Sequence, residues 1–395
     1  MPKYALFSFR MSDDEKNHFR AIMLAFAALG FHVGVWAVLL ADLARSLGLG
    51  PGSLGVALTC QSAAGVAALL VGGRLADSES FGRRPVLVVG ISATGVYLAL
   101  LAFVESYAAF IAVLVFSGMV SMCDLACNSL GGDYERAHDA KAMTFFHAGF
   151  SGAAAVGALG SGAALASGVG FGTIFLAVGA ALFALSVAFL RVPLPRSSVV
   201  PEDDVGETSS GTLALLRVPA VFACVAIIFM CFSTDAALEG YTSIYLRDLL
   251  GAGAFLGGVG LASLYFAGAM SRLFSAAAIL RFGERKVLFS SGLVSTLGLG
   301  TVLATDMPSV AALGLLLVGV ALAPVAPIVF SMTSRATPGQ SGRAVSLVTA
   351  SGYFAFTLSP VIVGGLADLS SLRMSFLLLL ALCAGISILS RRMPE

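Results

Sequence analysis

Long apolar runs separated by short polar breaks are the dominant pattern along the chain. A helix needs roughly 20 apolar residues to cross the hydrocarbon core of a bilayer. Runs of about this length predict twelve membrane-spanning helices, at 20–46, 52–74, 86–104, 107–131, 142–166, 170–191, 218–247, 254–281, 287–304, 309–333, 342–366 and 373–390. The pattern therefore predicts an all-α protein that crosses the membrane repeatedly.

Composition and motifs exclude several function classes. Of the 395 residues, 58% are hydrophobic and 11% are charged, against about 25% charged in soluble domains. The net charge of +1 does not indicate a nucleic-acid partner. No phosphate loop, His-Glu-x-x-His or nucleophile-elbow pattern occurs, and the six cysteines fall inside apolar runs, where they are expected to pack as small residues. We expect neither an enzyme, nor a cofactor, nor a metal site.

The basic residues predict the orientation. If both termini are cytoplasmic, the cytoplasmic segments hold 19 of the 23 Lys and Arg residues, the external loops hold three, and Arg272 lies within a span. An excess of Lys and Arg marks the cytoplasmic side of a membrane protein. We therefore predict a multi-pass inner-membrane protein with both termini in the cytoplasm.

A central polar segment and a weak internal repeat divide the chain. Residues 192–217 are rich in Pro, Ser, Gly and acidic residues and predict a cytoplasmic linker between six-helix bundles at 1–191 and 218–395. Gly82-Arg-Arg-Pro-Val-Leu87 recurs as Gly283-Glu-Arg-Lys-Val-Leu288. Repeated halves place a transporter's binding site between them, near the bilayer midplane.

The segment after the second predicted helix resembles a signature of the major facilitator superfamily. It reads Gly73-Arg-Leu-Ala-Asp77-Ser-Glu-Ser-Phe-Gly82-Arg83-Arg84, against G-x-x-x-D-[RK]-x-G-[RK]-[RK] in the family. Two extra residues precede Gly82, and Ser78 replaces a basic residue. The resemblance implies two bundles of six helices and a conformational latch in this loop, through which Asp77 reaches the other half.

Further motifs resemble the YbjJ-like and fucose-permease-like branch of that superfamily. They are Asp124-Leu-Ala-Cys-Asn128, Phe146-His147-Ala-Gly149-Phe150-Ser151, Gly268-Ala-Met-Ser-Arg272-Leu-Phe and Ser351-Gly352-Tyr353-Phe-Ala-Phe. Fucose-permease-like symporters carry an aspartate in the middle of the first helix, whereas this chain has His32 and Trp36 in that region. The resemblance implies a proton-coupled carrier of a sugar or related metabolite.

Three residues are the candidates for proton coupling. Ser121, Asp124 and Asn128 form one polar stripe on a helix, and a carboxyl group in a cavity of low dielectric constant can take and release a proton near neutrality. His147 and His32 are the other candidates, because imidazole titrates near physiological pH. A structural acid or an interhelical hydrogen bond remains the alternative in each case.

Other polar residues inside spans are candidates for binding the solute, because a charged group is costly at the bilayer centre. Arg272 has a planar fork that suits a hydroxylated or anionic ligand or, equally, an acidic side chain. Asp235 and Glu239 share a helix face. The full predicted set is Gln61, Asn128, Trp36, Asp235, Glu239, Tyr241, Arg272 and Tyr353.

These features together predict a monomeric secondary transporter that moves a small polar solute by alternating access, in symport with protons. Its partners would be the solute, protons and the lipid bilayer. Two alternatives remain open: a proton-coupled antiporter that exports drugs or metabolites, and a membrane sensor that binds solute without moving it. A proline-free run at Gly149–Gly162 is less typical of family antiporters.

Overall fold

The computed structural model describes residues 12–78, 80–139, 141–195, 213–337 and 340–393. In these ranges, twelve helical spans are long and apolar enough to cross a membrane, as the apolar runs predicted. The helices of the N-half are α1 (Asp13–Ser46), α2 (Pro51–Ala76), α3 (Arg83–Leu101), α4 (Tyr107–Ser117), α5 (Val120–His138), α6 (Met143–Ala166) and α7 (Phe171–Phe189). The C-half holds η1 (Leu215–Arg217), α9 (Pro219–Ile244), η2 (Tyr245–Leu249), α10 (Ala254–Phe282), α11 (Glu284–Ala304), α12 (Pro308–Leu322), α13 (Val325–Ala336), α14 (Ser341–Leu369) and α15 (Leu372–Ser390).

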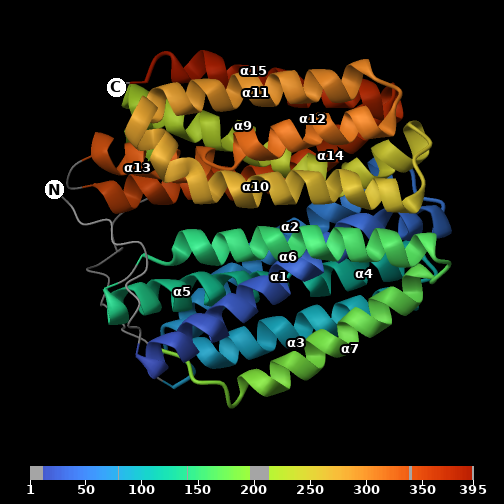
Figure 1. Ribbon diagram of the computed structural model, residues 1–395, viewed down its shortest axis with the longest axis horizontal. Helices are drawn as coiled ribbons and strands as arrows, with labels where there is room; N and C mark the ends of the chain where they lie inside the picture. The colour runs from blue at the N-terminus through green and yellow to red at the C-terminus, as the bar shows by residue number, and fades with distance from the viewer. Residues whose placement is uncertain (1–11, 79, 140, 196–212, 338–339, 394–395) are drawn as a thin grey trace.

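The two halves lie against each other, with α6 beside α10 and α2 beside α14 (Figure 1). One face of the molecule carries the start of α1 and the end of α15, and we call it the terminal face. The other, where α1 ends and α2 begins, is the opposite face. Of the predicted linker, residues 196–212 lie outside the described residues.

The predicted repeat corresponds to matching geometry in the two halves. Gly82 and Gly283 precede α3 and α11 with φ of +76° and +85°, a conformation that favours glycine. The next residue of each repeat forms an ion pair: Arg83 of α3 with Asp133 of α5, and Glu284 of α11 with Arg335 of α13. Each half therefore has an ion pair between corresponding helices, with the acidic and basic residues exchanged between the two halves.

The span formed by α12 and α13 is interrupted at Pro324, which has no N–H to donate to the carbonyl of Val320 four residues earlier. The Ser271 hydroxyl of α10 donates to that carbonyl instead, with an Oγ–O distance of 2.7 Å. The serine therefore satisfies a backbone carbonyl that the proline leaves without a helical partner. Such carbonyls need a partner within the protein because lipid tails cannot donate hydrogen bonds.

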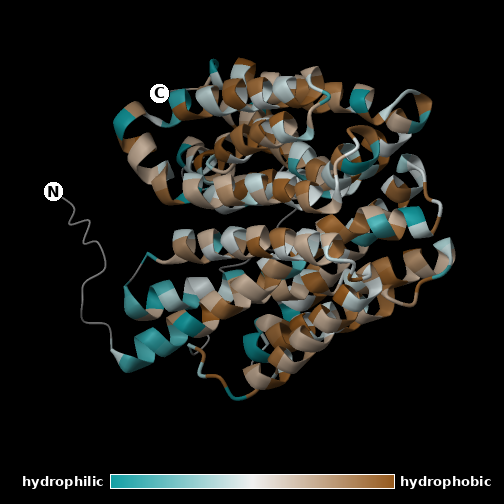
Figure 2. Cartoon of the chain, turned by 45° about the vertical axis from the view of Figure 1, so that its right-hand side comes forward, coloured by the Kyte–Doolittle hydropathy of each residue, from teal (hydrophilic) through white to brown (hydrophobic). Residues whose placement is uncertain are grey.

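The most hydrophilic residues gather towards the two ends of the helices, and the middle of the helices is mainly hydrophobic (Figure 2). Near the middle of their spans, Leu297 of α11 is 59% exposed and Phe183 of α7 49%, exposures that are favourable in lipid and unfavourable in water. Inside, small residues allow close helix contacts. A Cβ added to Gly258 of α10 would lie 2.7 Å from the carbonyl oxygen of Ala158 on α6, so these two helices pack backbone to backbone.

Candidate functional site

Ion pairs between the halves close the opposite face. Arg247, in η2, donates from both terminal nitrogens to the two carboxylate oxygens of Asp42 on α1, at 2.5 and 2.9 Å. Arg45 of α1 adds a bond to Asp248 with an Nε–Oδ1 distance of 3.1 Å. Only 9% of the Arg247 side chain and 14% of the Asp42 side chain are exposed, so this bidentate pair is shielded from solvent.

The closure continues inward along α2 and α14. The Tyr241 hydroxyl lies 3.0 Å from the Pro51 carbonyl and 2.9 Å from the Pro360 carbonyl, to either of which it can donate. The Gly52 amide donates to Asp368, and the Thr59 hydroxyl to the Thr357 carbonyl at 2.8 Å. Tyr241, predicted to bind solute, is buried in this contact between the halves.

Within the span formed by α10, Arg272 reaches the N-half. Its Nη1 donates to the Ser151 hydroxyl of α6 at 2.6 Å. The guanidinium also interacts electrostatically with Asp235 of α9 and His147 of α6. The His147 ring packs edge-on against Phe26, with the ring centroids 5.1 Å apart. A predicted proton-coupling residue on α6 and a predicted solute-binding residue on α9 therefore interact with one guanidinium.

Glu239 lies on the same helix as Asp235, with which it interacts electrostatically. It interacts electrostatically with Tyr97 of α3 and Tyr265 of α10. Tyr97 is hydrogen-bonded to His32 Nε2 and packs edge-on against Trp36. Glu239 of the C-half thus acts electrostatically on Tyr97, the hydrogen-bond partner of His32 in the N-half.

Asp124 of the N-half acts electrostatically on Tyr353 of α14 in the C-half. Asn128 Nδ2 donates to Asp124 Oδ1 at 3.0 Å. Gln61 donates to the Ser117 hydroxyl at 2.8 Å. Tyr353 is 36% exposed.

The predicted latch residues contact their own half in this conformation. Arg83 bonds Asp133 and donates to the Ser129 carbonyl at 3.0 Å. Asp77 has a side chain that is 67% exposed and lies 3.8 Å from Arg83, and Arg84 donates to the Leu190 carbonyl. Gly73 has open space around it. A latch from Asp77 to the C-half therefore stays a prediction for another conformation.

The structure places several of the predicted polar residues at a similar depth. Gln61, Asp124, Asp235 and Tyr353 each lie no more than three residues from the middle of their spans. Sequence reasoning missed Tyr97 and Tyr265. The Tyr265 hydroxyl is buried and has no hydrogen-bond partner among the described residues. A signal existed for it, because Tyr265 precedes Arg272 by seven residues and so shares its helix face.

The chain matches the Major Facilitator Superfamily family model at residues 21–277 and 261–394, and it belongs to that family. It is 28% identical over 373 residues to an uncharacterized MFS-type transporter of Yersinia pestis, covering 93% of this chain and 94% of the relative. It is 26% identical over 381 residues to an uncharacterized transporter of Sinorhizobium fredii, covering 94% and 97%. The protein is therefore a membrane transporter of this superfamily and not an enzyme.

Solved structures share the fold at low sequence identity. A mutant of the nucleoside transporter NupG has a TM-score of 0.75 at 15% identity, covering 95% of this chain and all of its own. A bacterial homologue of the human lysosomal transporter Spinster, inward-facing and occupied, has a TM-score of 0.69 at 13% identity, covering 98% of both chains. The human organic anion transporter MFSD10 has a TM-score of 0.65 at 18% identity, covering 95% and 99%.

Proposed function

We propose that the protein moves a small polar solute, a sugar or related metabolite, by alternating access in symport with protons. The observation that carries this proposal is the position of Arg272, which is bonded to Ser151 of the other half beside Asp235 and His147. A charged group at the bilayer centre is costly unless it has partners or a task. A guanidinium held between the two moving halves can bind solute and respond to their movement.

The chemistry around Arg272 suits a ligand that carries hydroxyl groups. The guanidinium donates in a fork, whereas Asp235 and Glu239 can accept from hydroxyls. Tyr353 and Tyr265 offer aromatic faces with a polar tip. The motifs that resemble the fucose-permease-like branch favour a sugar, and the shared fold with a nucleoside transporter extends the candidates to sugars that carry a base.

Asp124 is the proposed proton carrier. In its ionised form it accepts a hydrogen bond from the Asn128 amide, and its charge acts on Tyr353 of the other half. Protonation removes that charge and so changes the relative stability of the inward- and outward-facing states. His147 and His32 are the secondary candidates, since His147 interacts with Arg272 and His32 is hydrogen-bonded to Tyr97.

The excess of basic residues at the terminal face supports a cytoplasmic location for both termini in the inner membrane. With that orientation, the closed opposite face is external and the conformation is inward-facing. The protein would act as a monomer, because the proposed site lies between the two halves of one chain.

A thermal-shift screen of sugars, nucleosides and organic acids at two pH values would identify the solute. Proteoliposomes with an imposed pH gradient would then show the direction of coupling. Under the proposal, a gradient that drives protons inward concentrates the stabilising solute inside. Solute movement against the proton flow would indicate the antiporter, and binding without any flux would indicate the sensor; either result would overturn the proposal.

A further inference from the structure

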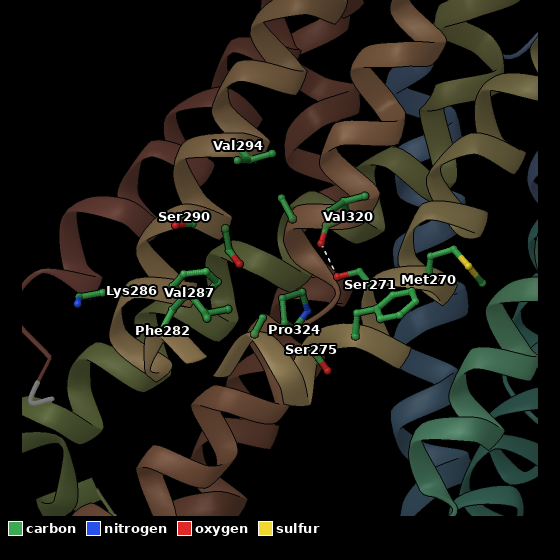
Figure 3. A pocket seen from close by; sticks show the side chains of 14 residues that line it. Met270, Ser271, Ser275, Phe282, Lys286, Val287, Ser290, Val294, Val320 and Pro324 are labelled. Carbon is green, nitrogen blue, oxygen red and sulfur yellow. Dashed lines mark hydrogen bonds between the residues drawn. The ribbon is translucent and has the colours of Figure 1, made fainter. Parts of the chain in front are cut away.

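A lateral groove lies on the C-half, away from the site between the halves. It has a volume of about 620 Å³ and is lined by side chains of α10, α11 and α12 together with Pro324 (Figure 3). This volume falls within the roughly 300–1,000 Å³ of ligand pockets. The α11 helix packs mainly against α12 and α15 on the side away from the N-half, so the groove opens towards lipid.

The walls of the groove are apolar even where they contain serines. Phe274 and Phe282 are 67% and 54% exposed along it. The Ser271 hydroxyl donates to the Val320 carbonyl and the Ser275 hydroxyl to the Arg272 carbonyl. Both hydroxyls already donate hydrogen bonds within the protein, so neither is free to donate to a polar ligand deep in the groove.

Cations stand at one rim of the groove. Lys286 lines it where α11 begins, and its ammonium points outward from the groove (Figure 3). Arg281 lies over the Phe282 ring, with its guanidinium carbon 5.3 Å from the ring centroid. Both residues are exposed and lie near the terminal face. A ligand for this groove therefore combines an apolar body with an anionic end.

The length of the groove matches one leaflet. Met270 and Phe282 both line it and are twelve residues apart on α10, a rise of about 18 Å. One leaflet contributes roughly half of the ~30 Å hydrocarbon core. A lipid with its headgroup at Lys286 would therefore extend an acyl chain along the groove to the middle of the membrane.

We propose that this groove binds an anionic phospholipid of the leaflet at the terminal face, with the phosphate at Lys286 and one acyl chain against Phe274 and Val320. The cytoplasmic leaflet, which the proposed orientation places here, is the one rich in anionic lipid. The bound chain would lie against the Ser271–Val320 contact beside Pro324. It would thus stabilise the span interrupted at Pro324 through its contact with Ser271, the residue that precedes Arg272.

The test is a titration of delipidated, purified protein with phosphatidylglycerol or phosphatidylcholine of identical chains, with bound lipid counted by native mass spectrometry. We expect one phosphatidylglycerol to bind about fivefold more tightly than phosphatidylcholine, the effect of one basic residue near an anionic headgroup. Lys286→Gln should abolish this preference. Lys16→Gln, an exposed lysine at the terminal face of the other half, is the matched control and should preserve it.

Two groove-filling variants, Ala278→Phe and Ser290→Leu, should each weaken the binding of both lipids by several fold, provided that their melting temperatures match the wild type. Equal affinity of the wild type for the two lipids would overturn the proposal, as would unchanged binding by a folded groove-filling variant. Displacement of phosphatidylglycerol by the transported solute would also overturn it, because the groove would then be a path for the cargo.

Discussion

Arg272 of α10 and Ser151 of α6 join the two halves of the protein inside the helical spans, with Nη1 2.6 Å from Oγ. The bond ties the guanidinium to the N-half while Asp235 of the C-half acts on the same charge. A group shared in this way changes its surroundings whenever the halves move apart. Under the proposed function, this pair is the point at which solute binding and conformational change are coupled.

Arg272→Lys should raise the KM for transport by about tenfold to a hundredfold, because hydrogen bonds to a charged group contribute roughly 1.5–3 kcal/mol and lysine lacks the fork. Ser151→Ala should raise KM only a few fold, since it removes one neighbour and leaves the guanidinium. Initial uptake rates across a range of solute concentrations measure both. An unchanged KM for Arg272→Lys would make Arg272 a charge partner of the protein alone.

Asp42→Asn should open the opposite face. Breaking the bidentate pair with Arg247 removes a shielded contact between the halves, and we expect a shift of about 1–3 kcal/mol, or roughly 5- to 150-fold in the ratio of the two states. Spin labels at the exposed positions 46 and 370 report the separation of the halves by electron spin resonance. The prediction is a larger fraction at long distance.

The matched control for that experiment is Asp306→Asn. Asp306 pairs with Arg373 at 2.5 Å on the same face, but both residues belong to the C-half. This variant should leave the distance distribution unchanged. Equal effects of the two variants would mean that the Asp42–Arg247 pair does not hold the halves together.

Gly258→Val should hinder closure of the opposite face, because its side chain would meet the Ala158 carbonyl where α10 crosses α6. Overpacking of this kind costs about 1–3 kcal/mol, and here only the closed arrangement bears the cost. Gly160→Val on α6 has nothing within 4 Å of the added Cβ and is the control. Transport should fall by about tenfold in the first variant only, and similar losses in both would point to helix propensity instead.

Arg83→Gln and Arg335→Gln compare the exchanged ion pairs of the two halves. Arg83 and Asp133 have side chains that are 9% and 0% exposed, whereas Arg335 is 60% exposed. Loss of a buried partner costs about 3 kcal/mol or more, and loss of an exposed one about 0–1 kcal/mol. Thermal melting should show a large decrease for Arg83→Gln only, partly recovered by adding Asp133→Asn.

The twelve spans could be predicted from sequence because the bilayer imposes a minimum apolar length on each spanning helix, and this length is visible in the sequence as a long apolar run. The depth of Asp124, Asp235 and Arg272 followed from the same runs. Their partners did not, because contacts such as Arg272 with Ser151 and Arg247 with Asp42 depend on how separate helices pack. Sequence also gave no reason to connect Tyr97 with His32, since only the fold brings α3 against α1 at that depth.

Tyr241 illustrates the same limit. Its place within a predicted span, on the same helix as Asp235 and Glu239, made it a candidate for binding the solute. In the structure its hydroxyl lies against the Pro51 and Pro360 carbonyls of two other helices. A tyrosine in a span can bind a ligand or donate a hydrogen bond to another helix. Which backbone carbonyls it can reach depends on how the helices pack, which the sequence does not reveal.

The most direct test of proton-coupled transport measures solute and proton movement together in proteoliposomes, for the wild type and for Asp124→Asn. The wild type should take up protons in a fixed ratio to solute. Asp124→Asn should still bind the solute in a thermal-shift assay but should move no protons and accumulate no solute against its gradient. Full proton-coupled accumulation by Asp124→Asn would contradict the proposed role of Asp124, and solute flux without proton flux in the wild type would contradict symport itself.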